Sequence, residues 1–195
     1  MFLHRLSRFE QQILTIHPGE FYATGDDVVI STVLGSCVAV GLYDPGAGMG
    51  GLNHFMLPGV MKKDELIANP NARYGMHAME LLINELMKLG LRKRDMVAKV
   101  FGGGSVLRLH GTEASAIPRS NIEFAFEYLE KESIPVVASD VGGRQPRKIF
   151  FFPRSGKVLL TRIGGQRAGV VEKEEEEYLE AIRRAPREGP IRMFK

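Results

Sequence analysis

Two short apolar segments on either side of a tight turn constrain the fold of this chain more than any other feature. Residues 37–43 and 49–57 are apolar and partly β-branched, which is typical of strands. Between them, Pro45 and Gly46 suit the second and third positions of a type II turn, because proline fixes φ and glycine tolerates φ > 0. The sequence therefore predicts an antiparallel hairpin.

This hairpin brings the only cysteine of the chain close to a histidine. If the chain reverses at the centre of the turn, Cys37 stands directly opposite His54. Directly opposed side chains of an antiparallel pair point to the same face, with Cβ atoms about 4.5–5.5 Å apart. A thiol and an imidazole at this separation suit the nucleophile and base of a cysteine enzyme, and such a base needs a third group to hold its ring. The nearest hydroxyls are those of Ser31 and Thr32, on an expected strand at 28–34.

A structural role is the alternative hypothesis for both residues. Free cysteine is among the most buried residue types and usually acts as a small hydrophobic side chain. A histidine inside an apolar strand is likewise more often a hydrogen-bonded core residue than a catalyst. The spacing of Cys37 and His54 leaves both hypotheses open.

Longer segments around these two residues favour the catalytic hypothesis. They are Pro18-Gly19-Glu20, residues 31–40, Leu42-Tyr43-Asp44, residues 50–58, Arg73-Tyr74, residues 101–104, Asn121-Ile122 and residues 140–143. Through these segments the chain resembles the CheD family, the chemoreceptor glutamine deamidases, over about residues 15–165.

The resemblance implies a protein-glutamine glutaminase, an amidohydrolase that converts selected glutamines of methyl-accepting chemotaxis receptors to glutamate. Methylesterase activity is the expected side reaction. The implied triad is Cys37, His54 and Thr32, with Ser31 as the alternative third member. We expect backbone N–H groups at the sharp turn of Gly35 and Ser36 to stabilise the oxyanion. The resemblance also implies a CheC-type phosphatase as a partner, and the competing hypothesis is a chemotaxis adaptor that binds receptors and this phosphatase without catalysis.

Composition and motifs narrow the remaining function classes. No aromatic–basic pattern of a nucleic-acid-binding surface is present, although the formal net charge is +3. The histidines have no zinc-ligand spacing, and the glycine run at 102–104 lacks the P-loop pattern, so we predict no metal and no cofactor. A single cysteine, no secretory signal and no apolar run of about 20 residues predict a cytoplasmic protein without membrane insertion.

Along the chain, helices interleave with largely antiparallel strands, which predicts a single α/β domain in the α+β style with mixed sheets. The resemblance implies a three-layer α/β/α sandwich. We expect residues 1–20 to form a variable N-terminal extension that contains a short helix at 5–13. Residues 21–168 should form a CheD-like deamidase domain, and residues 169–195 a charged C-terminal helix and tail. Residues 172–180 hold six glutamates and one lysine, which is typical of a solvated helix face. Further helices are expected at 72–89, 119–131 and 171–185, and further strands at 96–101, 135–139, 147–152 and 157–163.

Overall fold

The computed structural model describes residues 2–4, 9–60, 69–106 and 113–184. In this part of the chain, ten strands form two five-stranded sheets, accompanied by three α-helices. The strands are β1 (Phe2–His4), β2 (Gln12–Thr15), β3 (Phe21–Thr24), β4 (Val28–Leu34), β5 (Val38–Asp44), β6 (Met49–Asn53), β7 (Val97–Gly102), β8 (Val136–Val141), β9 (Arg147–Phe151) and β10 (Val158–Arg162). The helices are α1 (Ala72–Lys88), α2 (Glu113–Lys131) and α3 (Gln166–Arg184), with a 3₁₀ turn at Lys93–Asp95.

Both sheets are mixed. The first sheet has the strand order β1-β2-β4-β9-β10, and the second has the order β3-β6-β5-β7-β8. The pairs β2–β4 and β7–β8 are parallel, and the other pairs are antiparallel. The α/β class with mixed sheets is therefore confirmed.

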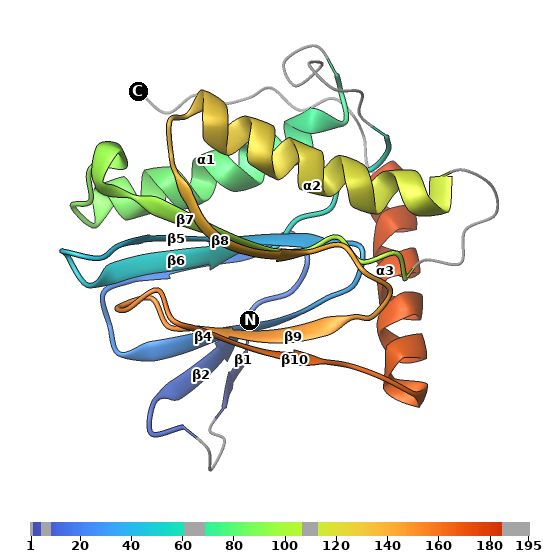
Figure 1. Cartoon of the computed structure of the whole chain (residues 1–195), viewed down its shortest axis with the longest axis horizontal. Coiled ribbons are helices and arrows are strands. Elements are labelled where there is room, and N and C mark those ends of the chain that lie inside the picture. Colours follow the sequence, from blue (N-terminus) through green and yellow to red (C-terminus); the bar gives the residue numbers. More distant parts are fainter. Residues whose placement is uncertain (1, 5–8, 61–68, 107–112, 185–195) are drawn as a thin grey trace.

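The three layers follow one another as helices, second sheet and first sheet. Helices α1 and α2 lie side by side on the outer face of the second sheet, and α3 stands across one end of both sheets (Figure 1). The expected α/β/α order differs in its third layer, since the described residues place no helix over the outer face of the first sheet. That face buries only a small cluster of Ile13, Val29 and Phe150, against which Phe9 and Phe152 pack, so little apolar area is left for a helix to cover.

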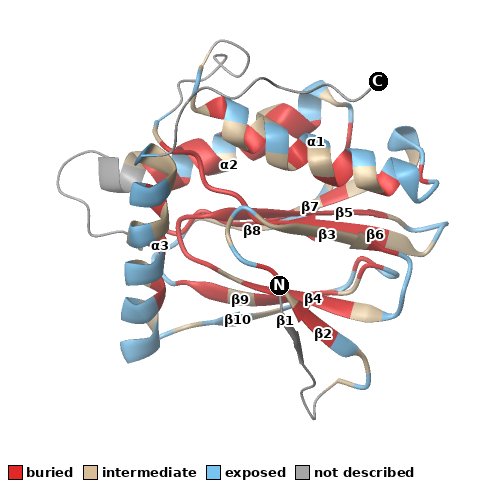
Figure 2. Ribbon diagram, turned by 180° about the vertical axis from the view of Figure 1, so that it is seen from behind, coloured by how far each residue is buried: buried red, intermediate tan, exposed pale blue. Residues whose placement is uncertain are grey.

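Strand β5 lies at the centre of the core and is buried on both faces (Figure 2). Val38, Val40 and Leu42 point to the helices, whereas Ala39 and Tyr43 point to the first sheet. This alternation follows from the two-residue period of a strand. The continuous apolar run 37–43 is thus the sequence signature of a strand between two layers.

The hairpin is present, but its predicted register is wrong by two residues. Asp44 pairs with Met49, so residues 45–48 form a four-residue loop, and the Asp44 carboxylate accepts the N–H of Gly46 at 2.7 Å. Cys37 therefore does not lie directly opposite His54. Because side chains alternate with a period of two, an even shift keeps both on the same face of the sheet.

Near the N-terminus the sequence prediction is also wrong. The helix expected at 5–13 is replaced in its described part by β2, which pairs in parallel with β4; residues 5–8 lie outside the described residues. Helix α2 begins six residues earlier than expected and contains Pro118. The domain boundaries at residues 20 and 168 stay a prediction.

Candidate active site

Cys37, His54 and Thr32 meet between the two sheets, at the end across which α3 stands. Cys37 lies immediately before β5, His54 immediately after β6, and Thr32 within β4 of the opposite sheet. Each of the three is at most 1% exposed. The Cys37 Sγ and a ring nitrogen of His54 are within 4.8 Å of each other. Two residues from one sheet and one from the other are thus brought together only by the packing of the layers.

The Thr32 hydroxyl determines which ring nitrogen of His54 carries the proton. Thr32 Oγ1 lies 2.8 Å from His54 Nδ1 and also 2.8 Å from the carbonyl oxygen of Ile16. A hydroxyl has one proton, and donating it to the carbonyl leaves the oxygen to accept from Nδ1–H. His54 Nε2 then keeps a lone pair, and it is buried without a hydrogen-bond partner among the described residues. The orientation of the ring therefore leaves Nε2 available to accept a proton.

Ser31, the alternative third residue, points away from His54. Side chains alternate along β4, so Thr32 shares the inter-sheet face with Ile30, while Ser31 lies on the outer face opposite its register partner Phe150. The Ser31 hydroxyl is buried and has no hydrogen-bond partner in the described part of the chain. Of the two hydroxyls, that of Thr32 contacts the histidine.

Two segments of the resemblance hold the backbone of the site. The Gly19 N–H donates to the His54 carbonyl at 2.8 Å, and the His54 N–H donates to the Glu20 carbonyl at 3.0 Å. From α2, Asn121 donates its amide N–H to the Ser36 carbonyl at 2.9 Å and accepts the Leu57 N–H at 2.8 Å. These contacts fix the strand end that carries His54 and the peptide that joins Ser36 to Cys37. None of these roles is predicted from the sequence.

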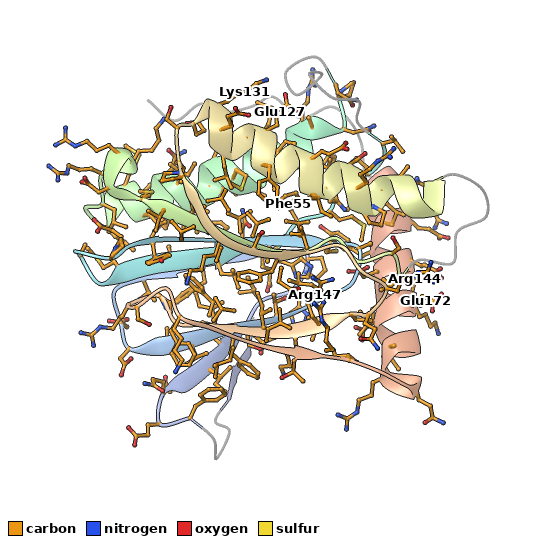
Figure 3. All side chains as sticks on the ribbon, in the orientation of Figure 1. Phe55, Glu127, Lys131, Arg144, Arg147 and Glu172 are labelled. Atoms are coloured by element: carbon orange, nitrogen blue, oxygen red, sulfur yellow. The ribbon has the colours of Figure 1, made fainter. Side chains whose placement is uncertain are left out.

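Arg147 stabilises the two turns that contain Gly102 and Gly142, next to the candidate site. It is fully buried between the sheets (Figure 3) and donates to the carbonyl and carboxylate of Asp140 and to the carbonyl of Gly142. Gly142 in turn donates its N–H to the Gly102 carbonyl at 2.9 Å. The buried guanidinium binds one carboxylate and two carbonyls, and it thereby positions these turns beside residues 35–37, which we call the cysteine loop.

The side chain of Glu175 reaches from α3 into the cysteine loop. Its Oε1 accepts the N–H groups of Gly35 at 2.9 Å and Cys37 at 3.2 Å. Its Oε2 accepts the N–H of Ser36 at 2.5 Å and the Ser36 hydroxyl at 2.6 Å. Gly35 and Ser36, named from the sequence as oxyanion support, thus contribute donors that converge on one carboxylate.

The sequence prediction of a solvated face at residues 172–180 is wrong for Glu175, which is only 3% exposed. One signal for its burial was present in the sequence. Val171, Glu175 and Leu179 follow one another at intervals of four and form the buried stripe of α3, so the glutamate interrupts an apolar pattern.

The protonation states follow from this environment. Burial raises the pKa of the Cys37 thiol well above its usual value, and the charge of Glu175 and a hydrogen bond with it raise this pKa further. Burial lowers the pKa of His54 to about 3, with a smaller contribution from the charge of His17. At neutral pH the pair is therefore an uncharged thiol beside an uncharged imidazole.

Cys37, His54 and Glu175 are also types of residue that bind metal ions, and their ligand atoms lie within 4.8 Å of one another. However, each carboxylate oxygen of Glu175 already accepts two donors. A metal ion would have to compete with these hydrogen bonds. The expected absence of a metal stays a prediction.

Comparison with known proteins relates the chain to one family. Residues 56–162, more than half of the chain, match the family described as CheD chemotactic sensory transduction. A protein of Laribacter hongkongensis named probable chemoreceptor glutamine deamidase CheD is 47% identical over 186 residues, covering 95% of this chain and 89% of its own length. The chain belongs to the CheD family. A second CheD protein, probable chemoreceptor glutamine deamidase CheD 1 of Shewanella oneidensis, is 45% identical with the same coverage.

Solved structures similar to this CheD family member have low sequence identity. The Bacillus licheniformis hypothetical protein YfiH aligns with a TM-score of 0.42 and 13% identity, covering 67% of this chain and 60% of its own. The Neisseria meningitidis protein NMB0706 aligns with a TM-score of 0.42 and 13% identity, covering 78% of this chain and 74% of its own. In the described part of this CheD family chain, the helices are too short or too polar to cross a membrane.

Buried, uncharged His54 is expected to make this CheD family member less stable in acid. Its folded pKa of about 3 lies below the ordinary value of 6.5, so the unfolded chain takes up the proton first. The contribution of His54 to stability is full above pH 6.5 and is lost progressively as the pH falls toward 3. Between pH 7 and pH 5 the free energy of unfolding should fall by about 2 kcal/mol through this group.

Urea unfolding of the wild type and of His54→Gln at both pH values measures this contribution. The variant should show a pH dependence smaller by about 2 kcal/mol. His77→Gln, on the exposed side of α1, is the matched control and should keep the wild-type dependence. The same pH dependence in the wild type and His54→Gln would contradict the prediction.

Proposed function

We propose that this protein is a cysteine-dependent deamidase that converts glutamine side chains of methyl-accepting chemotaxis receptors to glutamate. The observation that carries the proposal is the hydrogen bond from His54 to Thr32, which leaves Nε2 unengaged near the only thiol of a CheD family chain. The receptor and the glutamine come from the names of its relatives, which are called probable chemoreceptor glutamine deamidases.

In the proposed first step, His54 Nε2 takes the thiol proton, and the Cys37 sulfur attacks the carbonyl carbon of the glutamine side chain. The oxyanion that forms takes the place of the Glu175 carboxylate and accepts the N–H groups of the 35–37 loop, whose Ser36 carbonyl is held by Asn121. The C–N bond then breaks, and ammonia leaves with the proton from His54. A thioester on Cys37 remains.

In the second step, a water molecule attacks the thioester while His54 accepts its proton. The C–S bond breaks, glutamate is released, and the proton returns to the thiol. Thr32 keeps the ring oriented through both steps. The chemistry needs no cofactor, and a glutamate methyl ester presents the same acyl centre, so methylesterase activity is the expected side reaction.

The proposed setting is the cytoplasm, because a reducing compartment preserves the nucleophilic thiol of a single cysteine. The proposed substrate partners are the cytoplasmic helices of chemoreceptors. A CheC-type phosphatase as a further partner stays a prediction from the family resemblance.

The test is mass spectrometry of a folded receptor cytoplasmic fragment after incubation with wild-type protein or with Cys37→Ala. We expect conversion of glutamine to glutamate at particular positions by the wild type alone. Conversion by both proteins would contradict the thiol mechanism. Conversion by neither would remove the deamidase proposal and favour the adaptor hypothesis. Binding of the fragment to Cys37→Ala should persist in either case, which confirms that the variant is folded.

A further inference from the structure

Glu175 presents the product of the proposed reaction at the place where that reaction occurs. Deamidation of glutamine leaves a glutamate side chain, and a glutamate side chain occupies the cysteine loop here. Its carboxylate accepts four donors from Gly35, Ser36 and Cys37, and a carboxylate oxygen lies within 4.8 Å of the thiol sulfur. The unpartnered, buried His54 Nε2 lies in the same cluster. The donors, nucleophile and base thus surround one side-chain carbon.

The loop has room for this carboxylate because position 35 has no side chain. A Cβ atom on Gly35 would lie 2.6 Å from Glu175 Oε2 and 2.5 Å from Val106 Cγ2. Contacts this short require one of the partners to move. The glycine therefore leaves a cradle for a side-chain carboxylate or amide beside the thiol.

Helix α3 places Glu175 at the cysteine loop while burying only a narrow stripe of its own surface. Three of its nineteen residues are buried, Val171, Glu175 and Leu179, and the outer side of the helix is exposed (Figure 2). At its far end, Tyr74 donates its hydroxyl to the Ile182 carbonyl at 3.4 Å. The helix thus presents a glutamate between two apolar residues, one four positions before it and one four positions after it.

We propose that α3 occupies the substrate-helix site of this enzyme, with Glu175 as a built-in analogue of the reaction product. This inference rests on the proposed deamidase function. A receptor helix then has to displace α3, and its target glutamine has an apolar residue four positions before it and another four positions after it. While α3 is in place, Cys37 is inaccessible and the enzyme is at rest.

If the inference is correct, the protein should deamidate a glutamine introduced at its own position 175. In Glu175→Gln, the oxygen of the introduced amide can accept the N–H groups of Gly35 and Cys37. The amide nitrogen then takes the place of Oε2, where it donates to the Ser36 hydroxyl, while the Ser36 N–H loses its acceptor. Cys37 then attacks the amide carbon, ammonia leaves, and water hydrolyses the thioester. Position 175 returns to glutamate in an intramolecular reaction without any receptor.

The experiment compares peptides covering residues 166–184 from three purified full-length variants by mass spectrometry. In Glu175→Gln we expect the mass of the wild-type peptide, which shows that the amide has been hydrolysed. In the double variant Cys37→Ala/Glu175→Gln the introduced glutamine should persist. Glu174→Gln is the matched control, because this neighbouring glutamate is exposed, and it should also keep its glutamine.

The outcomes separate this inference from the proposed function. If the glutamine of Glu175→Gln persists while the same preparation deamidates a receptor fragment, Glu175 is a structural anchor and the inference is overturned. Conversion at position 175 that needs Cys37, without deamidation of any receptor fragment, supports the inference and removes the receptor as substrate. Conversion in the Cys37→Ala background overturns the inference.

A second variant tests the displacement of α3 without touching the site. Leu179→Ala removes an apolar contact of α3, so the undocked population should rise. Because Cys37 is the only cysteine, alkylation by iodoacetamide measures its accessibility in the intact protein. We expect alkylation and receptor deamidation to accelerate by about 10-fold or more. Leu86→Ala, on the buried face of α1, is the control for general loosening and should leave both rates near wild type. Unchanged rates in Leu179→Ala would overturn the inference.

Discussion

Replacing His54 by glutamine should lower the rate of receptor deamidation by about 10⁴-fold, because the thiol loses its base and the departing ammonia loses its acid. The burial of Cys37 makes this loss large. With its pKa raised well above the usual value, the thiol does not ionise at neutral pH without a base in contact. Deamidation of a receptor fragment under single-turnover conditions measures the effect, with thermal unfolding to confirm the fold. A His54→Gln variant within 10-fold of the wild type would contradict the proposed role.

Variants of β4 distinguish the two hydroxyls that the sequence left open. Thr32→Val keeps the shape of the side chain and removes the acceptor for His54 Nδ1–H, so the rate should fall by about 10- to 100-fold. Thr32→Ser restores a hydroxyl and should recover most of the rate. Ser31→Ala should keep wild-type activity, because Ser31 faces the outer side of the sheet. A larger loss for Ser31→Ala than for Thr32→Val would contradict the geometry.

Introducing a methyl group at Gly102 should lower the free energy of unfolding by about 3–5 kcal/mol. Gly102 has φ +111° and pairs with Val38 at the start of β5. A Cβ atom here would collide with the carbonyl oxygen of Cys37, which belongs to the backbone and cannot rotate away. The same oxygen accepts the Gly103 N–H at 2.7 Å, so relieving the collision also displaces the loop that carries Cys37.

Gly90 provides a matched control for this substitution. It has a similar φ of +103°, and a Cβ atom there would meet nothing within 4 Å. Gly90→Ala should therefore cost only the conformational strain of a positive φ, about 1–2 kcal/mol. Urea unfolding of both variants measures the difference. Equal losses would show that the collision at Gly102 is relieved without cost.

Local sequence patterns determined several elements of this protein. The apolar run of β4 and the helical spacing in α1 predicted these elements to within one residue, because each carries a strong periodic signal of its own. The hairpin, the thiol and histidine on one face, and the family resemblance also came from the sequence. Strands β1 to β3 were missed, because they have three or four residues each and are stabilised by partners distant in the sequence.

Only the tertiary structure decided how the site is assembled. The register of the hairpin depended on a loop stabilised by Asp44. Which of the Ser31 and Thr32 hydroxyls contacts His54 depended on which face of β4 meets the other sheet, and no local pattern contains this information. The burial of Glu175 depended on the docking of α3. A glutamate side chain is buried only where hydrogen-bond donors satisfy its carboxylate, and here the N–H groups of Gly35 and Ser36 do so. Sequence periodicity thus predicted which residue types would be near one another, and layer packing determined which atoms meet.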